Sequence, residues 1–183
     1  VILSILILLI VPYNMVLAQG VSKSRHNLSA SGKGTVKTMD DSRICIFCHT
    51  SHIANPKDPM WNRKKSGAVY TLYDSSTLDA KPGQPDGTSI LCLSCHDGTV
   101  ALGNTFKNPN SMSFAHSMTK RGNLGTDLSD DHPISFVYDE SLAAEDGGLK
   151  DPSTFSKDVL DKNEKLQCLS LIHISEPTRL RRI

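Results

Sequence analysis

The stretches Cys45-Ile46-Phe47-Cys48-His49 and Cys92-Leu93-Ser94-Cys95-His96 decide how this chain is interpreted. Each follows the pattern Cys-x-x-Cys-His, the attachment signature of c-type haem. Two thiols at this spacing lie on one face of a helical turn, where each can add to a haem vinyl group, and the adjacent histidine then reaches the iron. Histidine makes up 7 of 183 residues, so chance does not explain its position after both cysteine pairs. We name residues 45–49 the first motif and residues 92–96 the second motif.

Both ends of the chain are expected to lie outside the functional domain, which we predict to span residues 19–168. Residues 1–18 are apolar and uncharged and end in small residues, which is typical of a secretory signal peptide whose start is missing. The alternative is an uncleaved membrane anchor. Residues 169–183 resemble the translated end of a transposase adaptor used in DNA libraries, and we interpret them as a sequencing artefact. The alternative is a genuine basic tail.

Composition excludes several classes of partner. The formal net charge of the whole chain is +1, and the predicted domain is close to neutral because residues 169–183 carry three Arg against one Glu. This balance gives no reason to expect nucleic acid or an anionic membrane surface as a partner, and we predict no membrane span in the mature chain. Aromatic residues make up 5% of the chain, so a conventional core would be thin. Bound haem can supply the missing apolar mass.

The pattern of residues predicts a mainly irregular fold with a few short α-helices, wrapped around covalently bound haems. Residues 19–38 are rich in Ser, Gly and Lys and read as an irregular arm. Each motif is expected on a short helix, the first capped by Asp41 or Ser42 and the second by Thr88 or Ser89. Three further segments are expected to be regular: a short strand at 68–73, a helical turn or two at 138–145, and a helix at 156–165.

Haem binding assigns roles within the motifs. His49 and His96 become the proximal iron ligands. The thioether anchors are Cys45, Cys48, Cys92 and Cys95. One alternative is a zinc ribbon, because two Cys-x-x-Cys pairs can form a Cys₄ site, but zinc would not require His49 or His96. A second alternative is a pair of disulfides, which also does not call for a histidine after each pair.

The sixth ligand decides what each haem does. The histidine candidates outside the motifs are His26, His52, His116 and His132, and the methionine candidates are Met39, Met60, Met112 and Met118. An iron with two histidine ligands is six-coordinate and has no open site for a substrate, so it favours electron transfer over catalysis. Methionine as the sixth ligand would raise the reduction potential relative to histidine.

Three segments resemble the exported multihaem c-type cytochromes of anaerobically respiring bacteria, which have doubled Cys-x-x-Cys-His motifs. These segments are residues 45–52, 92–103 and 123–136, and His26-Asn27-Leu28-Ser29 is also similar. The resemblance implies low-potential, mostly bis-His haems and a periplasmic or outer-surface location. It also implies that Cys168 begins a third motif. Ser51 departs from the family, which often has proline there, but it carries no ligand.

The resemblance also implies three distal ligands for three haems, and His26, His52 and His132 occupy the family-like positions. His116 lies outside these segments and is the spare candidate. His52 follows His49 by three residues and cannot fold back onto the same iron. If His52 is a ligand, it serves a neighbouring haem, which predicts closely packed haems.

We therefore expect an exported electron carrier that binds heme c and exchanges electrons with redox partner proteins, rather than an enzyme. The first alternative is a multihaem oxidoreductase of the nitrite-reducing kind, which would need one five-coordinate haem with an open iron. The second alternative is a zinc-stabilised binding module.

Overall fold

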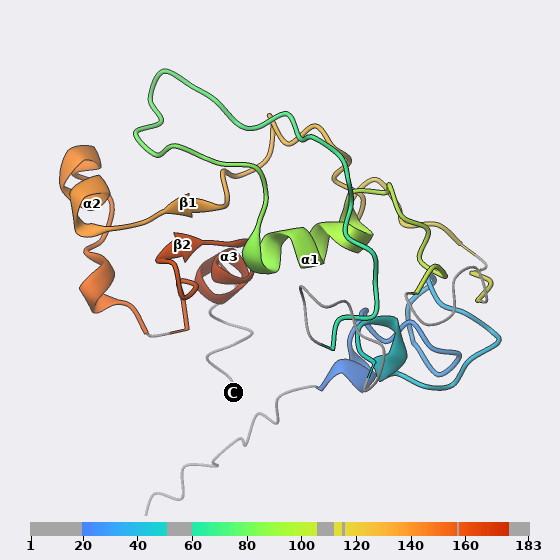
Figure 1. Cartoon of the computed structure of the whole chain (residues 1–183). Helices are drawn as coiled ribbons and strands as arrows, with labels where there is room; N and C mark the ends of the chain where they lie inside the picture. The colour runs from blue at the N-terminus through green and yellow to red at the C-terminus, as the bar shows by residue number, and fades with distance from the viewer. Residues whose placement is uncertain (1–19, 51–59, 106–111, 115, 157, 176–183) are drawn as a thin grey trace, which may run out of the picture.

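The computed structural model describes residues 20–50, 60–105, 112–114, 116–156 and 158–175. Most of these residues lie in loops and turns, and the regular elements are short (Figure 1). In chain order the elements are the 3-10 helices η1 (Val21–Lys23) and η2 (Cys45–Phe47), helix α1 (Gly87–His96), strand β1 (Phe136–Val137), helix α2 (Glu140–Asp146), the 3-10 helix η3 (Pro152–Thr154), strand β2 (Lys165–Leu166) and helix α3 (Cys168–Ser175). Within the described residues, no helix is long and apolar enough to cross a membrane.

Helix α1 lies at the centre of the molecule and carries the second motif at its C-terminal end (Figure 1). Its first residue, Gly87, has a φ of +49°, and a Cβ there would lie 2.8 Å from the side-chain nitrogen of Gln167. Both the backbone and the packing therefore require glycine. The N-cap position belongs to Asp86, not to the expected Thr88 or Ser89. The Ser89 hydroxyl instead donates a 2.5 Å hydrogen bond to Gln167.

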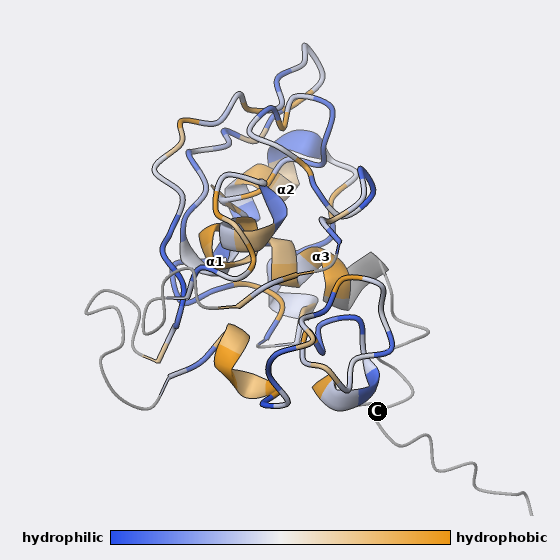
Figure 2. Ribbon diagram, turned by 90° about the vertical axis from the view of Figure 1, so that its right-hand side faces the viewer, coloured by the Kyte–Doolittle hydropathy of each residue, from blue (hydrophilic) through white to orange (hydrophobic). Residues whose placement is uncertain are grey.

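Among the described residues, most buried hydrophobic side chains form two small clusters, and Phe47 lies outside both, beside Phe114. The first joins α1 and α3 to neighbouring loops and contains Tyr70, Ile90, Leu93, Leu128 and Ile134. The second surrounds the paired strands and contains Phe136, Tyr138, Leu142 and Leu166. Leu171 of α3 packs against both clusters. Figure 2 shows hydrophobic residues on α1 and α3, with mostly hydrophilic loops around them. The protein interior is thin, as its low aromatic content predicts.

Strands β1 and β2 form an antiparallel pair in which Phe136 faces Leu166 and Val137 faces Lys165. The pair closes a loop that contains α2, which lies close to the helical turns expected at 138–145. The helix expected at 156–165 is wrong, because the described residues there form turns that lead into β2. The Asp161 carboxylate accepts hydrogen bonds from the backbone N–H groups of Asn163 and Lys165, and this turn replaces the helix.

The strand expected at 68–73 is also wrong, although the segment is extended. Thr71 forms a single parallel bridge with Asp127. Tyr70, which precedes Thr71, is bound by the side chain of Gln84. The Gln84 amide accepts from the Tyr70 N–H at 2.9 Å and donates to the Tyr70 carbonyl at 2.9 Å. A side-chain amide therefore takes the two backbone groups that a partner strand would have used.

The segment expected to be an irregular arm is folded, and its His26 ring lies beside His96 of the second motif. Its only regular element among the described residues is η1, but Asn27 and Ser29 are buried. The Asn27 side chain accepts from both the N–H and the hydroxyl of Ser29, which closes a local turn. The Thr38 N–H donates to the carbonyl of Leu28, and the arm is folded back on itself.

Leu93→Ala tests how much the first cluster contributes to stability. The Leu93 side chain has no exposed surface and packs between α1 and the loops. We expect the free energy of unfolding to fall by about 2–5 kcal/mol, because truncation leaves a cavity. The matched control is Val69→Ala at a side chain that is 83% exposed, which should change stability by less than about 0.5 kcal/mol. Urea unfolding of the purified protein measures both, and equal effects would contradict this assignment of the core.

Candidate haem-attachment site

The second motif occupies the last turns of α1. Cys92 and Cys95 are three residues apart on one helix, so their side chains lie on the same face, and His96 is the last helical residue. The Nδ1 atom of His96 lies 2.6 Å from the carbonyl oxygen of Gly122. A carbonyl only accepts, so Nδ1 carries the proton and Nε2 is left with a lone pair for a metal. This is the arrangement that orients a metal-binding histidine.

His26, predicted as a distal ligand, faces His96. Their ring centroids are 6.2 Å apart and their planes meet at 73°. A metal–imidazole bond is about 2.0–2.1 Å long and the nitrogen lies about 1 Å from its ring centre, so two imidazoles on opposite sides of one metal have centroids about 6 Å apart. Burial and the proximity of His96 lower the pKa of His26, which favours the neutral form that binds metal. The separation of the two rings fits one iron between them.

The first motif begins with the 3-10 turn η2, not with an α-helix. The N–H groups of Cys48 and His49 both donate to the Cys45 carbonyl, at 3.2 Å and 2.8 Å. The expected cap is also absent, because Asp41 binds the backbone and guanidinium of Arg43 instead. His49 is exposed, and its ring lies 6.0 Å from that of Trp61 at 85°. The Trp61 indole nitrogen is buried and has no hydrogen-bond partner among the described residues, so it is available to a ligand.

The two motifs are tied together by Asn62 and Arg63, which are consecutive in the chain. The Asn62 side chain donates a 2.5 Å hydrogen bond to the Ile46 carbonyl, and its N–H donates to the Cys48 carbonyl at 2.9 Å. The Arg63 guanidinium donates to the Ser94 carbonyl in the second motif at 3.1 Å. One short segment therefore holds the backbone of both attachment sites.

Because this segment joins the motifs, the Cys95 thiol of the second motif affects the pKa of Cys48 in the first. Burial raises the pKa of Cys48, and the neighbouring Cys95 raises it further. Burial also raises the pKa of Cys95, while the positive charge of Arg63 opposes the rise at both thiols. Such interactions require Cys48, Cys95 and Arg63 to lie close together.

Cys168 lies on the opposite side of the second motif, at the start of α3. A hydrogen bond between the two thiols raises the pKa of Cys92 and lowers the pKa of Cys168 to about 7. The Cys168 N–H also donates to the Ser89 hydroxyl at 3.0 Å, which joins α3 to α1. All five cysteines are free thiols, so neither of the alternative disulfides is present in the structure. The second motif has Cys48 on one side and Cys168 on the other.

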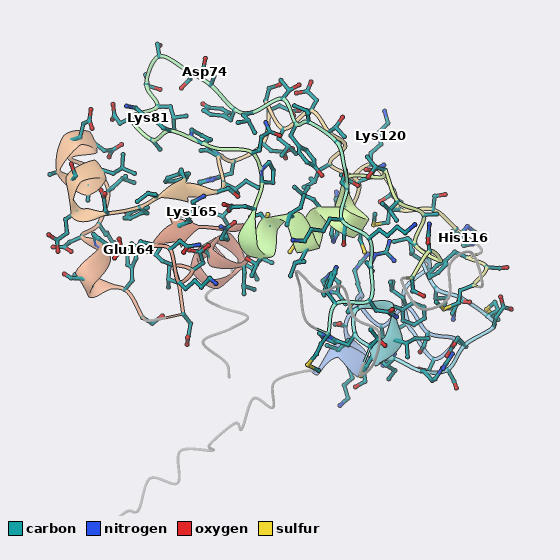
Figure 3. All side chains as sticks on the ribbon, in the orientation of Figure 1. Asp74, Lys81, His116, Lys120, Glu164 and Lys165 are labelled. Carbon is teal, nitrogen blue, oxygen red and sulfur yellow. The ribbon has the colours of Figure 1, made fainter. Side chains whose placement is uncertain are left out.

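A cavity of about 540 Å³ opens beside Cys95, which is within the size range of small-molecule and cofactor sites. Met112, Phe114, His116 and Met118 contribute to its wall. His116 is the spare candidate for a distal ligand, and it lines the same cavity as Cys95. Figure 3 shows its side chain on the side of the molecule away from Glu164 and Lys165.

The remaining predicted ligands are not brought to a motif in this way. His132 is exposed, and its Nδ1 lies 2.7 Å from the carbonyl oxygen of Pro133. His52 lies outside the described residues. In the described part of the chain, no group of three histidine, cysteine, aspartate or glutamate side chains is arranged to hold a bare metal ion. The residues present fit a haem at the second motif best, because they supply two thiols, two neighbouring imidazoles and an adjoining cavity.

Two residues that hold the second motif in place, Arg63 and Gly122, were not predicted from the sequence. Nothing in the sequence marks Arg63 as buried or Gly122 as the acceptor of His96, because both roles arise from contacts between distant segments.

No protein-family model matches the chain, and no curated protein matches it either. The family resemblance therefore stays a prediction from the motifs.

The turn that follows His96 is stabilised by Asp97. The Tyr70 hydroxyl donates a 2.6 Å hydrogen bond to the Asp97 carboxylate, which also accepts from the N–H and hydroxyl of Thr99. Burial opposes the charged form, but these donors outweigh it and hold the pKa of Asp97 below its usual value. Burial and the bond to Asp97 raise the pKa of Tyr70 to about 12.

This pair predicts a loss of stability at alkaline pH. The folded Tyr70 has a pKa of about 12, above its ordinary value near 10, so its contribution is complete below about pH 10 and is lost as the pH rises through about 12. We expect the free energy of unfolding to fall over this interval, and to fall less in Tyr70→Phe. Urea unfolding at several alkaline pH values measures the slope. Identical slopes in both proteins would show that Tyr70 does not contribute.

Proposed function

We propose that the chain is an electron-transfer protein that carries heme c covalently attached at both motifs. The observation that carries this proposal is the pair of imidazoles at the second motif. His96 has its Nδ1 proton directed to Gly122, and the centroid of the His26 ring lies 6.2 Å from that of the His96 ring. Cys92 and Cys95 project from the same helix and supply the two thioether bonds.

Two histidine ligands favour electron transfer over catalysis. When bound, haem supplies an iron that accepts and releases one electron. His26 and His96 would both ligate this iron, so a substrate would have no place on it. The bond to Gly122 fixes the His96 imidazole before and after the electron moves. The chain therefore needs little rearrangement between oxidation states.

The arrangement of the motifs supports a relay. Asn62 and Arg63 hold the first and second motifs side by side, and Cys168 lies against Cys92. We propose that the attachment sites follow one another in space in the order of the sequence, with the second in the middle. Short distances between successive haems allow rapid transfer along such a row. A third attachment at Cys168 is part of this proposal.

The location and partners follow from the same proposal. Residues 1–18 read as an export signal, so the mature chain would lie in the periplasm or on the outer surface. Its partners there would be redox proteins that deliver and remove electrons. The near-neutral composition gives no support for nucleic acid.

The second candidate function is a multihaem oxidoreductase. The observation in its favour is the cavity beside Cys95, which is large enough for a small substrate and has His116 in its wall. This function requires one iron with an open axial position, and it therefore differs from the relay in how the reduced protein binds carbon monoxide.

Removing His26 tests the electron-transfer proposal. His26→Ala should convert one haem from low spin to high spin, because one axial position becomes open. We expect the reduced variant to bind about one more carbon monoxide per chain than the wild type. Visible spectra with carbon monoxide titration measure both quantities. The control is Arg25→Ala, an exposed neighbour whose replacement should change neither.

Two outcomes would contradict the proposal in different ways. An unchanged spectrum in His26→Ala would remove His26 from the ligands. Stoichiometric binding of carbon monoxide by the reduced wild type would favour the oxidoreductase, because it requires an open iron with His26 in place.

A further inference from the structure

Arg63 is fully buried, which is rare for a charged side chain without a partner of opposite charge. Its guanidinium donates to three backbone carbonyls, those of Ser94, Ala101 and Leu102, at 2.8–3.4 Å. No carboxylate of the described residues forms an ion pair with it. The carbonyls satisfy its hydrogen bonds, but no ion pair within the described part of the chain neutralises its positive charge.

The position of this charge relates it to both attachment sites. The backbone of Arg63 forms a bridge with Thr105, and its side chain reaches the last turn of α1. Ser94, whose carbonyl accepts from the guanidinium at 3.1 Å, directly precedes Cys95. The N–H of the adjoining Asn62 donates to the Cys48 carbonyl at 2.9 Å, so the charge lies close to both motifs. Asn62, the preceding residue, contacts the same first motif but carries no charge.

A guanidinium keeps its charge at every pH that the protein meets, and charges act over longer distances inside a protein than in water. A ferric haem carries one more positive charge than a ferrous haem. A fixed cation nearby therefore disfavours the oxidised form and raises the reduction potential. The field of Arg63 should be felt at both motifs, because one segment contacts both.

We propose that Arg63 is a positioning residue that holds a permanent positive charge between the two haem attachment sites and so raises the reduction potentials of their haems. This inference rests on the proposed function, since it requires haem at the motifs. It assigns to Arg63 a role that the hydrogen bonds alone do not require. A neutral side chain of similar reach could satisfy some of the same carbonyls.

The test compares Arg63→Gln with Arg63→Lys in the haem-loaded protein. Both variants lose the planar fork of donors, so both lose a similar part of the packing. The glutamine also removes the charge, and lysine keeps it. We expect Arg63→Gln to favour the oxidised haem by about tenfold, a fall in midpoint potential of about 59 mV for a one-electron couple. Arg63→Lys should stay close to the wild type. Spectroelectrochemical titration measures the potentials, and urea unfolding records the loss of stability separately.

Equal potentials in the wild type and Arg63→Gln, or equal shifts in both variants, would overturn the proposal. If Arg63→Gln does not fold, Ala101→Asp and Ala101→Asn provide the second comparison. The Ala101 carbonyl accepts from Arg63 at 3.2 Å, so an aspartate at this position places a negative charge near the guanidinium and offsets part of its field. We expect Ala101→Asp to lower the midpoint potential and Ala101→Asn to leave it unchanged. Equal midpoint potentials in the two variants would overturn the proposal. A wild type without covalent haem would instead refute the proposed function.

Discussion

The hydrogen bonds between the Arg63 guanidinium and the Ser94 carbonyl are the constraint on which the arrangement of the motifs depends. They attach the last turn of α1 to the segment that also holds the first motif through Asn62. The same turn is fixed from the other side by His96 and Gly122. The proposed role of His96 as an iron ligand needs a backbone that does not move, and these bonds would supply it.

The interior explains why polar contacts carry so much of the structure. Two clusters of four and five buried hydrophobic side chains are small for a chain of this length. Buried polar groups fill the space between them, and Gln167 alone contacts Ser89, Ser135, Asp86 and Asp161. A network of this kind specifies one arrangement because each unmet hydrogen bond is costly. Covalently attached haem would add the apolar surface that the side chains do not provide.

Local patterns in the sequence predicted local features. The helix that ends at His96 and the helical turns near residue 140 were expected, because their signals lie within a few residues. The helix at 156–165 was wrong, since Asp161 captures nearby N–H groups in a turn. The strand at 68–73 failed because Gln84, 14 residues from Tyr70, takes the place of a neighbouring strand. At the site, both motifs and His26 were named in advance. Their relative positions depend on Arg63 and Gly122, whose contacts span more than 20 residues, and no local pattern predicts them.

The pyridine haemochrome spectrum of the exported protein, quantified against its polypeptide, tests the central claim most directly. Haem attachment at both motifs predicts covalently bound heme c at a stoichiometry of at least two per chain, one for each complete motif. It also predicts that replacing Cys92 and Cys95 with alanine removes one of them. A chain that folds and is exported with its four motif cysteines free, and without covalent haem, would contradict the account.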